Sequence, residues 1–177
     1  DDDGVAHQVV DLLLVVVQGH GFQADFFAGP VGAHGHLAFG GGLGLGTTVT
    51  KGSQVNLGSA DMIAPIYIYG SVYGGGEEGQ VGGGKVATAD GYTDIPPAYG
   101  DVANVTVMSD GTHSVNIAGA VFGGGRGFVV DRNGVRTDSQ DDHDIAGVVY
   151  GNTHVAIGSD EQDSTKVRIG SLEYFTP

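Results

Sequence analysis

The sequence contains no cysteine, few basic residues and no long uninterrupted apolar run. The absence of cysteine excludes disulfides, thiolate zinc sites and cysteine nucleophiles. Only 7 Lys and Arg oppose 21 Asp and Glu, and the formal net charge of −14 disfavours binding to nucleic-acid phosphates and anionic lipids. The most apolar run, residues 9–17, is interrupted by Asp11 and is far shorter than the ~20 residues of a membrane helix. We therefore expect neither nucleic-acid binding nor membrane insertion.

Glycine, by contrast, is abundant. It supplies 34 of the 177 residues, well above its usual share of ~7%. There is no collagen-like period, and a hydrophobic fraction of 40% is too high for a disordered chain. The chain is long enough for one domain or a short repeat array, so we place the glycines in the turns of a folded, strand-rich structure.

A repeat of 50 residues organises most of the chain. The segments QVNLGSAD, NVTVMSDG and HVAIGSDE share one pattern and begin at Gln54, Asn104 and His154. Each alternates apolar with polar residues and then meets a small or acidic turn, which is the pattern of a strand and its end. A second alternating segment follows each copy and ends at Gly70, Gly119 or Gly170. We predict three units, each with two strands in equivalent positions.

An aromatic residue followed by three glycines recurs between the strands. The motif reads AFGGGLG at 38–44, GSVYGGG at 70–76 and GAVFGGG at 119–125. Glycine lets backbones approach closely, and the aromatic residue supplies apolar area that glycine lacks. We interpret the motif as a corner between stacked strands, with its aromatic side chain in the core; a flexible hinge is the alternative.

The glycine triples start at 40, 74 and 123, so the first unit lacks an insertion that the other two carry before their next long strand. These insertions span residues 77–98 and 126–148. In the second, Asn133-Gly134 between valines predicts a hairpin. In the first, Asp90-Gly91 and Pro96-Pro97 predict a loop. Insertions at one point of a repeat often emerge on one face and form its binding surface.

Short strands with hardly any helical pattern predict an all-β fold. Our first choice is a β-solenoid of three repeats of about 50 residues, each contributing about two coils. A closed threefold fold, a β-trefoil or β-prism, is the alternative. The last unit ends in SLEYFTP without the glycines, which is typical of a C-terminal cap. We divide the chain into an N-terminal cap or irregular segment, residues 1–37, and a glycine-rich repeat domain, residues 38–177.

The aromatic-glycine motifs, together with YGNTHVAIGSD, resemble the glycine-rich repeats of large secreted surface proteins and adhesins from gut bacteria, which are pictured as β-solenoids. The resemblance covers about residues 38–170. It implies a structural or adhesive role on the bacterial cell surface or outside the cell, with a glycan or a host cell-surface protein as partner. It carries over no catalytic residues. The opening DDDG lacks the basic region of a signal peptide, so we expect a mature form or a fragment of a longer chain.

The two insertions hold the candidate binding residues. The residues that suit a glycan are Tyr92, Tyr99, Phe128 and Arg132. The oxygen donors that suit calcium are Asp131, Asn133, Asp138, Asp141, Asp142 and Asp144. Their spacing differs from that of an EF-hand loop, and a solvated acidic loop explains the same residues.

Two other functions stay open. Arg126, Arg132 and Arg136 near the acidic loop would suit a carbohydrate-active β-helix enzyme, a lyase or hydrolase; however, a hairpin explains these residues without catalysis and the GxSxG motif is absent, so we expect no enzyme. Exposed sheet edges at the ends of an open array would favour self-association into a filament. An ice-binding ladder of threonines is not expected, because Thr106 aligns with Asn56 and Ala156.

Overall fold

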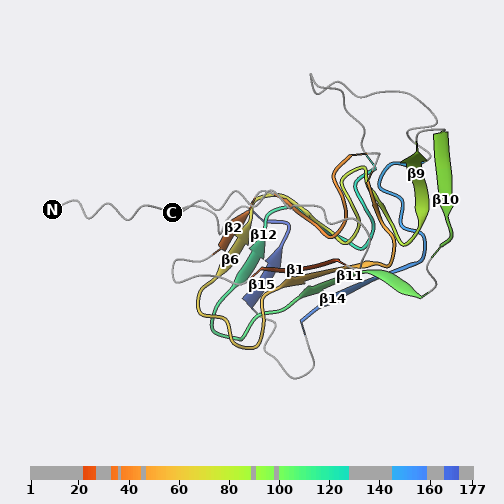
Figure 1. Cartoon of the computed structure of the whole chain (residues 1–177). Coiled ribbons are helices and arrows are strands. Elements are labelled where there is room, and N and C mark those ends of the chain that lie inside the picture. The colour runs from red at the N-terminus through yellow and green to blue at the C-terminus, as the bar shows by residue number, and fades with distance from the viewer. Residues whose placement is uncertain are drawn as a thin grey trace, which may run out of the picture.

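The computed structural model describes residues 22–26, 33–35, 37–44, 47–88, 91–97, 100–127, 145–158 and 166–171. Short β-strands dominate these residues, so the predicted all-β class is confirmed (Figure 1). No helix among the described residues is long and apolar enough to cross a membrane.

Three parallel sheets, here named A, B and C, are each built from strands that lie far apart in the sequence (Figure 1). Sheet A contains, in spatial order, β1 (Phe22–Phe26), β5 (Ser53–Leu57), β11 (Asp101–Val107) and β14 (Asn152–Ile157). Sheet B contains β2 (Ala33–Gly35), β6 (Ile66–Ile68), β12 (Val115–Ile117) and β15 (Val167–Ile169). Sheet C contains β3 (Ala38–Phe39), β7 (Val72–Tyr73) and β13 (Val121–Phe122). A smaller parallel pair joins β4 (Thr48–Val49) to β8 (Gln80–Val81), and Val149 bridges to Val81 beside it.

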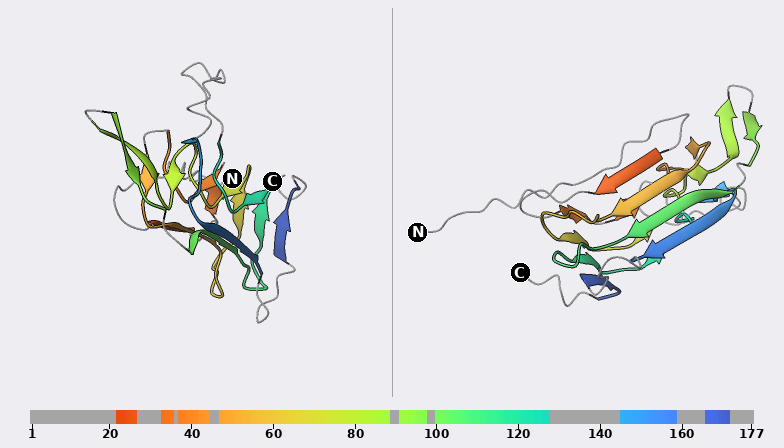
Figure 2. Two further views of the ribbon diagram at one scale, coloured as in Figure 1. Left: turned by 90° about the vertical axis from the view of Figure 1, so that its right-hand side faces the viewer. Right: turned by 90° about the horizontal axis from the view of Figure 1, so that it is seen from below.

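The chain visits these sheets in the same order each time. We call each visit a rung: rung 1 spans residues 22–49, rung 2 residues 53–81, rung 3 residues 101–149 and rung 4 residues 152–171. Figure 2 shows the four strands of sheet A side by side, in the order of the rungs. Each rung therefore stacks on the one that precedes it in the sequence.

The predicted register between units is confirmed. Val105 lies opposite Val55 on one side and Val155 on the other, and Thr106 likewise lies between Asn56 and Ala156. Equivalent residues of consecutive units are direct neighbours, so each unit makes one rung. The expectation of about two coils per unit is wrong, because each unit adds one strand to sheet A and one strand to sheet B.

Residues 22–26 and 33–35 take part in the stacking. Strand β1 pairs with β5 and strand β2 with β6, both parallel and in register. They are the edge strands of sheets A and B, the position that a cap would occupy, yet they continue the sheets of the repeat. The boundary that we placed at residue 38 is therefore no break in the sheets. Residues 1–21 lie outside the described residues.

The insertion after β8 forms an antiparallel hairpin. Strand β9 (Gly84–Thr88) pairs with β10 (Gly91–Ile95), and residues 89 and 90 connect them. We predicted a loop here. This is wrong at Gly91, which lies in β10, whereas Pro96 and Pro97 do lie outside any strand. The predicted hairpin at Asn133-Gly134 lies outside the described residues.

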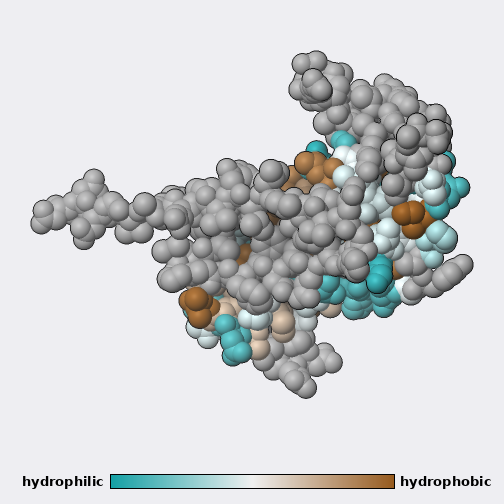
Figure 3. Space-filling view, in the orientation of Figure 1, coloured by the Kyte–Doolittle hydropathy of each residue, from teal (hydrophilic) through white to brown (hydrophobic). Residues whose placement is uncertain are grey.

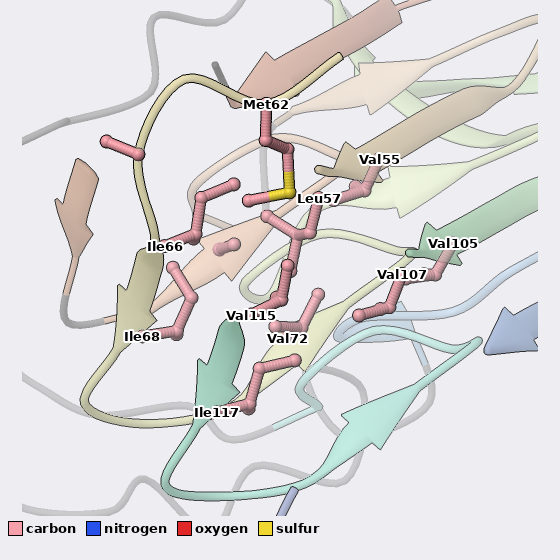
Figure 4. Packing of buried hydrophobic residues seen from close by; sticks show 12 residues of the cluster. Val55, Leu57, Met62, Ile66, Ile68, Val72, Val105, Val107, Val115 and Ile117 are labelled. Atoms are coloured by element: carbon pink, nitrogen blue, oxygen red, sulfur yellow. The ribbon is translucent and has the colours of Figure 1, made fainter. Parts of the chain in front are cut away.

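The core lies between sheets A, B and C (Figure 4). Alternate residues of the strands point inward. Their side chains are fully buried, with 0% exposure at Val55, Leu57, Ile66 and Ile117. Full burial of each such side chain contributes about 1.5–3 kcal/mol. A second, smaller cluster of Val49, Val81 and Ala103 fills the space beside the β4–β8 pair.

The glycine triples form tightly packed corners between rungs. The Gly74 N–H donates to Phe122 O at 2.8 Å, and the Gly75 N–H donates to Gly124 O at 3.0 Å. A Cβ atom at Gly74 would lie 2.5 Å from the carbonyl oxygen of Gly123 in the next rung. The interpretation as a corner between stacked strands is thus confirmed, and these contacts leave no room for a hinge.

The residues at the core positions are buried in rungs 2 and 3 but partly exposed in rung 4. Val105 and Val107 in β11 are 0% exposed, whereas Val155 and Ile157 at the same positions of β14 are 37% and 51% exposed. In sheet B, Ile117 is 0% exposed and Ile169 is 37% exposed. Rung 4 therefore presents an apolar end to solvent.

Candidate functional site

Most of the residues that we predicted to bind a ligand or calcium lie outside the described residues. These are Tyr99, Phe128, Asp131, Arg132, Asn133, Asp138, Asp141, Asp142 and Asp144. Tyr92 lies on β10, where its backbone is paired with Ala87. The ligand and calcium sites therefore stay predictions. Among the described residues, no group of three or more His, Cys, Asp or Glu side chains is placed to hold a metal ion.

The hairpin of β9 and β10 lies beside the rungs at one end of the molecule (Figure 1). The buried side chain of Gln80 holds its base. Gln80 Nε2 donates to Lys85 O at 3.0 Å, and Gln80 Oε1 accepts from the Lys85 N–H at the same distance. Tyr150 donates its hydroxyl to the same oxygen at 3.2 Å. Each polar atom of the Gln80 amide therefore has a partner, and Gln80 on β8 fixes the position of β9, the first strand of the hairpin.

Gln80 is a positioning residue that our sequence analysis missed. A glutamine directly before Val81 and a run of glycines looks like part of a solvated loop. Its side chain is nevertheless 0% exposed. One of its hydrogen-bond partners, Tyr150, lies 70 residues away in the sequence, and so no local pattern marks it.

The aromatic residues of the glycine corners form a column across three rungs. The rings of Phe39 and Tyr73 stack with centroids 4.9 Å apart and planes at 9°, and those of Tyr73 and Phe122 stack at 4.9 Å and 14°. Such pairs contribute about 0.5–1.5 kcal/mol each beyond the area that they bury. The column lies on the outside of sheet C, where Phe122 is 45% exposed.

The outward position of this column corrects our expectation that the aromatic residue fills the core. Successive side chains of a strand point to opposite faces. The preceding residues Ala38 and Val72 occupy the inward positions, at 2% and 0% exposure. The aromatic residues must then face outward.

The outer face of sheet A is polar. Gln54 donates from Nε2 to Asn56 Oδ1 at 2.7 Å along its own strand and to Thr106 Oγ1 at 3.5 Å in the next rung. Among the residues coloured in Figure 3, hydrophobic ones form small separate patches on the face shown. The outer face of sheet A thus offers amide and hydroxyl groups, which suit sugar hydroxyls better than an apolar partner.

Two charged contacts join the turns. Arg126 Nη1 and Glu77 Oε1 lie 2.6 Å apart between rungs 3 and 2. Because both side chains are partly exposed, this ion pair contributes at most about 1 kcal/mol. In the turn that follows β11, Asp110 Oδ1 accepts the backbone N–H groups of Thr112 and His113, and Asp110 Oδ2 lies 2.8 Å from His113 Nδ1.

The pKa of Asp110 reflects this turn. Burial raises the pKa, but the hydrogen bonds from the side chain and backbone of His113 and from the backbone of Thr112 outweigh it. The charge of His113 acts in the same direction, and the pKa falls to about 2. The carboxylate thus stays ionised and fastens the turn between β11 and β12.

Comparisons with known proteins give no relative from which a role could be taken. No protein-family model matches the chain, and no curated protein or solved structure was found to match it.

Proposed function

We propose that the chain is a structural or adhesive repeat domain of a bacterial extracellular surface protein, built as a β-solenoid of four rungs. The observation that carries the proposal is the parallel, in-register stacking of consecutive units in three separate sheets. Stacks of this kind make long, regular surfaces from short repeats.

An open solenoid explains the sheet order better than a closed threefold fold does. In a closed fold the first and last units would be neighbours. Strands β1 and β14 instead occupy opposite edges of sheet A, and β2 and β15 occupy opposite edges of sheet B. Rung 4 is exposed at core positions, as the end of an open array would be.

The adhesive surface would consist of the two insertions together with the polar face of sheet A. The hairpin of β9 and β10 carries Tyr92, and Gln80 fixes its base. An aromatic residue on the hairpin, together with amides and hydroxyls, suits a glycan, because sugars present both apolar ring faces and hydroxyl groups. The acidic part of the second insertion would add calcium as a bridging ion.

Binding of the purified chain to immobilised glycans, with millimolar calcium and then with a chelator, tests this proposal. We expect binding that Tyr92→Ala weakens by about tenfold or more, as is typical for the loss of a central aromatic contact. Tyr69→Ala is the matched control, since Tyr69 is exposed and lies in the turn after β6, apart from the hairpin.

The outcomes separate the two roles. Loss of binding in the chelator would add calcium to the site. If no glycan binds under either condition, the adhesive role is wrong and a purely structural role is the better account.

A second candidate function, that of a filament subunit, is favoured by the exposed apolar end of rung 4.

A further inference from the structure

Rung 4 exposes apolar side chains at positions that are buried in the core of rungs 2 and 3. In rung 3, the side chains of Val105, Val107 and Ile117 are 0% exposed. The equivalent residues of rung 4 are Val155, Ile157 and Ile169, which are 37%, 51% and 37% exposed. In rungs 2 and 3 these positions belong to one core cluster, to which both rungs contribute.

The strands of rung 4 are also edge strands of their sheets. Among the described strands, β14 pairs with β11 on one side only, and β15 pairs with β12 on one side only. Edge strands of this kind present unpaired N–H and C=O groups that can pair with a further strand. Any partner must therefore offer two parallel strands, in two different sheets, with apolar residues between them.

The opposite end of the molecule offers such a partner. Strands β1 and β2 are the outermost described strands of sheets A and B, and they run parallel to β14 and β15 through the intervening strands. A second copy displaced along the stacking direction would bring both strands into place together. In this register Gln23 would stand opposite His154, because Gln23, Gln54, Asn104 and His154 occupy one row.

We propose that rung 4 binds rung 1 of a second copy of the chain, head to tail; the inference rests on the solenoid architecture proposed above. The two contact surfaces differ, so the contact is not closed by a twofold axis and each added copy presents the same free end again. Repetition of such a contact gives an open filament. The formal charge of −14 per copy opposes the association, and added salt screens that repulsion.

Sedimentation velocity over a range of protein and salt concentrations tests the proposal. The mean mass of the wild type should rise with protein concentration, and more steeply at high salt. Ile157→Lys should weaken the association by about tenfold or more, because the substitution buries a charge in the contact. Ile63→Lys is the matched control: it makes the same chemical change at a residue that is 64% exposed in the loop between β5 and β6. Both variants should keep the circular dichroism of the wild type, since both residues are exposed.

Cross-linking determines the direction of the contact, since the chain has no cysteine of its own. Gln23→Cys and His154→Cys variants should form disulfide-linked dimers when mixed and oxidised. Neither should form them alone. A wild type that stays monomeric at every protein and salt concentration would overturn the proposal. So would equal effects of Ile157→Lys and Ile63→Lys, or dimers of His154→Cys with itself.

A disulfide within one chain distinguishes an error in the head-to-tail contact from an error in the solenoid architecture. Asn104→Cys and His154→Cys in one molecule report on the stacking of rungs 3 and 4 alone. If that disulfide forms while the wild type remains monomeric, the solenoid stands and the head-to-tail contact is wrong.

Discussion

At the scale of single residues, glycine sets how closely two rungs approach. Gly74 and Gly75 donate their N–H groups to the next rung, and no side chain would fit between the two backbones. The three glycines at 74–76 are therefore a packing requirement of their corner. The last rung has no counterpart of this triple in its sequence, SLEYFTP.

Replacement of Gly75 by alanine should lower the free energy of unfolding by about 3 kcal/mol or more, which is the range of severe overpacking. The added Cβ would lie 2.5 Å from the Gly125 nitrogen and 2.7 Å from its Cα, both backbone atoms that cannot rotate away. Chemical denaturation followed by circular dichroism measures the change.

Gly124→Ala provides the control at the equivalent position one rung later. A Cβ atom there meets no described atom within 4 Å. We expect a change within about 0.5 kcal/mol. Equal losses for both variants would show that the corner is sensitive to any side chain and that close stacking is not the cause.

The aromatic residues show how far residue patterns alone can be taken. The sequence predicts that they lie next to the glycine corners, and they do. Their direction was predicted wrongly because a two-residue strand is too short to show alternation. Only the burial of Ala38 and Val72 decides which neighbour faces the core.

At the scale of elements, turns join sheets A and B, and the turn after β11 is fastened by Asp110. Its carboxylate satisfies two backbone N–H groups and contacts His113 Nδ1. The pKa of Asp110 is about 2 in the folded chain, below the ordinary value of 3.8. A lowered pKa means that the ionised group favours the folded state. Its contribution is complete above the ordinary value and is lost as the pH falls through about 2.

Asp110→Ala should therefore lower the free energy of unfolding by about 1 kcal/mol at pH 7, after allowance for the partial solvent exposure of the turn. The difference between wild type and variant should shrink as the pH falls from about 4 to about 2. Urea denaturation at a series of pH values measures both quantities. Asp61→Ala, an exposed carboxylate in the matching turn of rung 2, should change little at any pH. A difference for Asp110→Ala that is independent of pH would mean that its charge does not contribute.

The strands of rungs 2 to 4 could be predicted because their spacing is constant. Rung 1 could not, since the pairing of Phe22 with Ser53 spans fewer residues than that of Ser53 with Ala103. The hairpin inserted between rungs 2 and 3 accounts for this difference, and it hid rung 1 from a search for equal periods. The same insertion was predicted as a loop, although Asp90-Gly91 is itself typical of a tight hairpin.

At the scale of the whole molecule, each rung contacts chiefly its neighbours, and one register runs through sheets A, B and C. The introduced cysteine pair Asn104→Cys and His154→Cys should oxidise readily, because these residues are direct neighbours on adjacent parallel strands. The disulfide closes a long loop and should raise the free energy of unfolding by up to about 4 kcal/mol relative to the reduced form. Thiol counting and denaturation with and without reductant measure both effects.

Asn104→Cys combined with Ala156→Cys is the control. It displaces one partner by two residues along the strand, beyond the reach of an unstrained disulfide. Equal oxidation of both pairs would contradict a fixed register between rungs 3 and 4.

The binding residues could be predicted only as members of insertions, and the structure brings one of them, Tyr92, onto a defined strand. Residues inside the repeat contact equivalent residues of the next unit at a constant spacing, and this spacing can be seen in the sequence. An insertion has no such neighbours, and the hairpin is held by Gln80, which contacts both the nearby Lys85 and Tyr150, 70 residues away in the chain.

The stacking of the rungs also decides how the molecule would respond to force. The backbone hydrogen bonds between two rungs point along the stacking direction, so a pull along that direction loads all the bonds of one junction at once. Successive junctions are loaded in series, and the weakest one sets the force at which the stack parts. Of the two junctions that rung 3 makes, the weaker one joins it to rung 4, where Val155 and Ile157 keep much of their surface in water. Tension would therefore separate rung 4 from rung 3 before it separates rung 3 from rung 2.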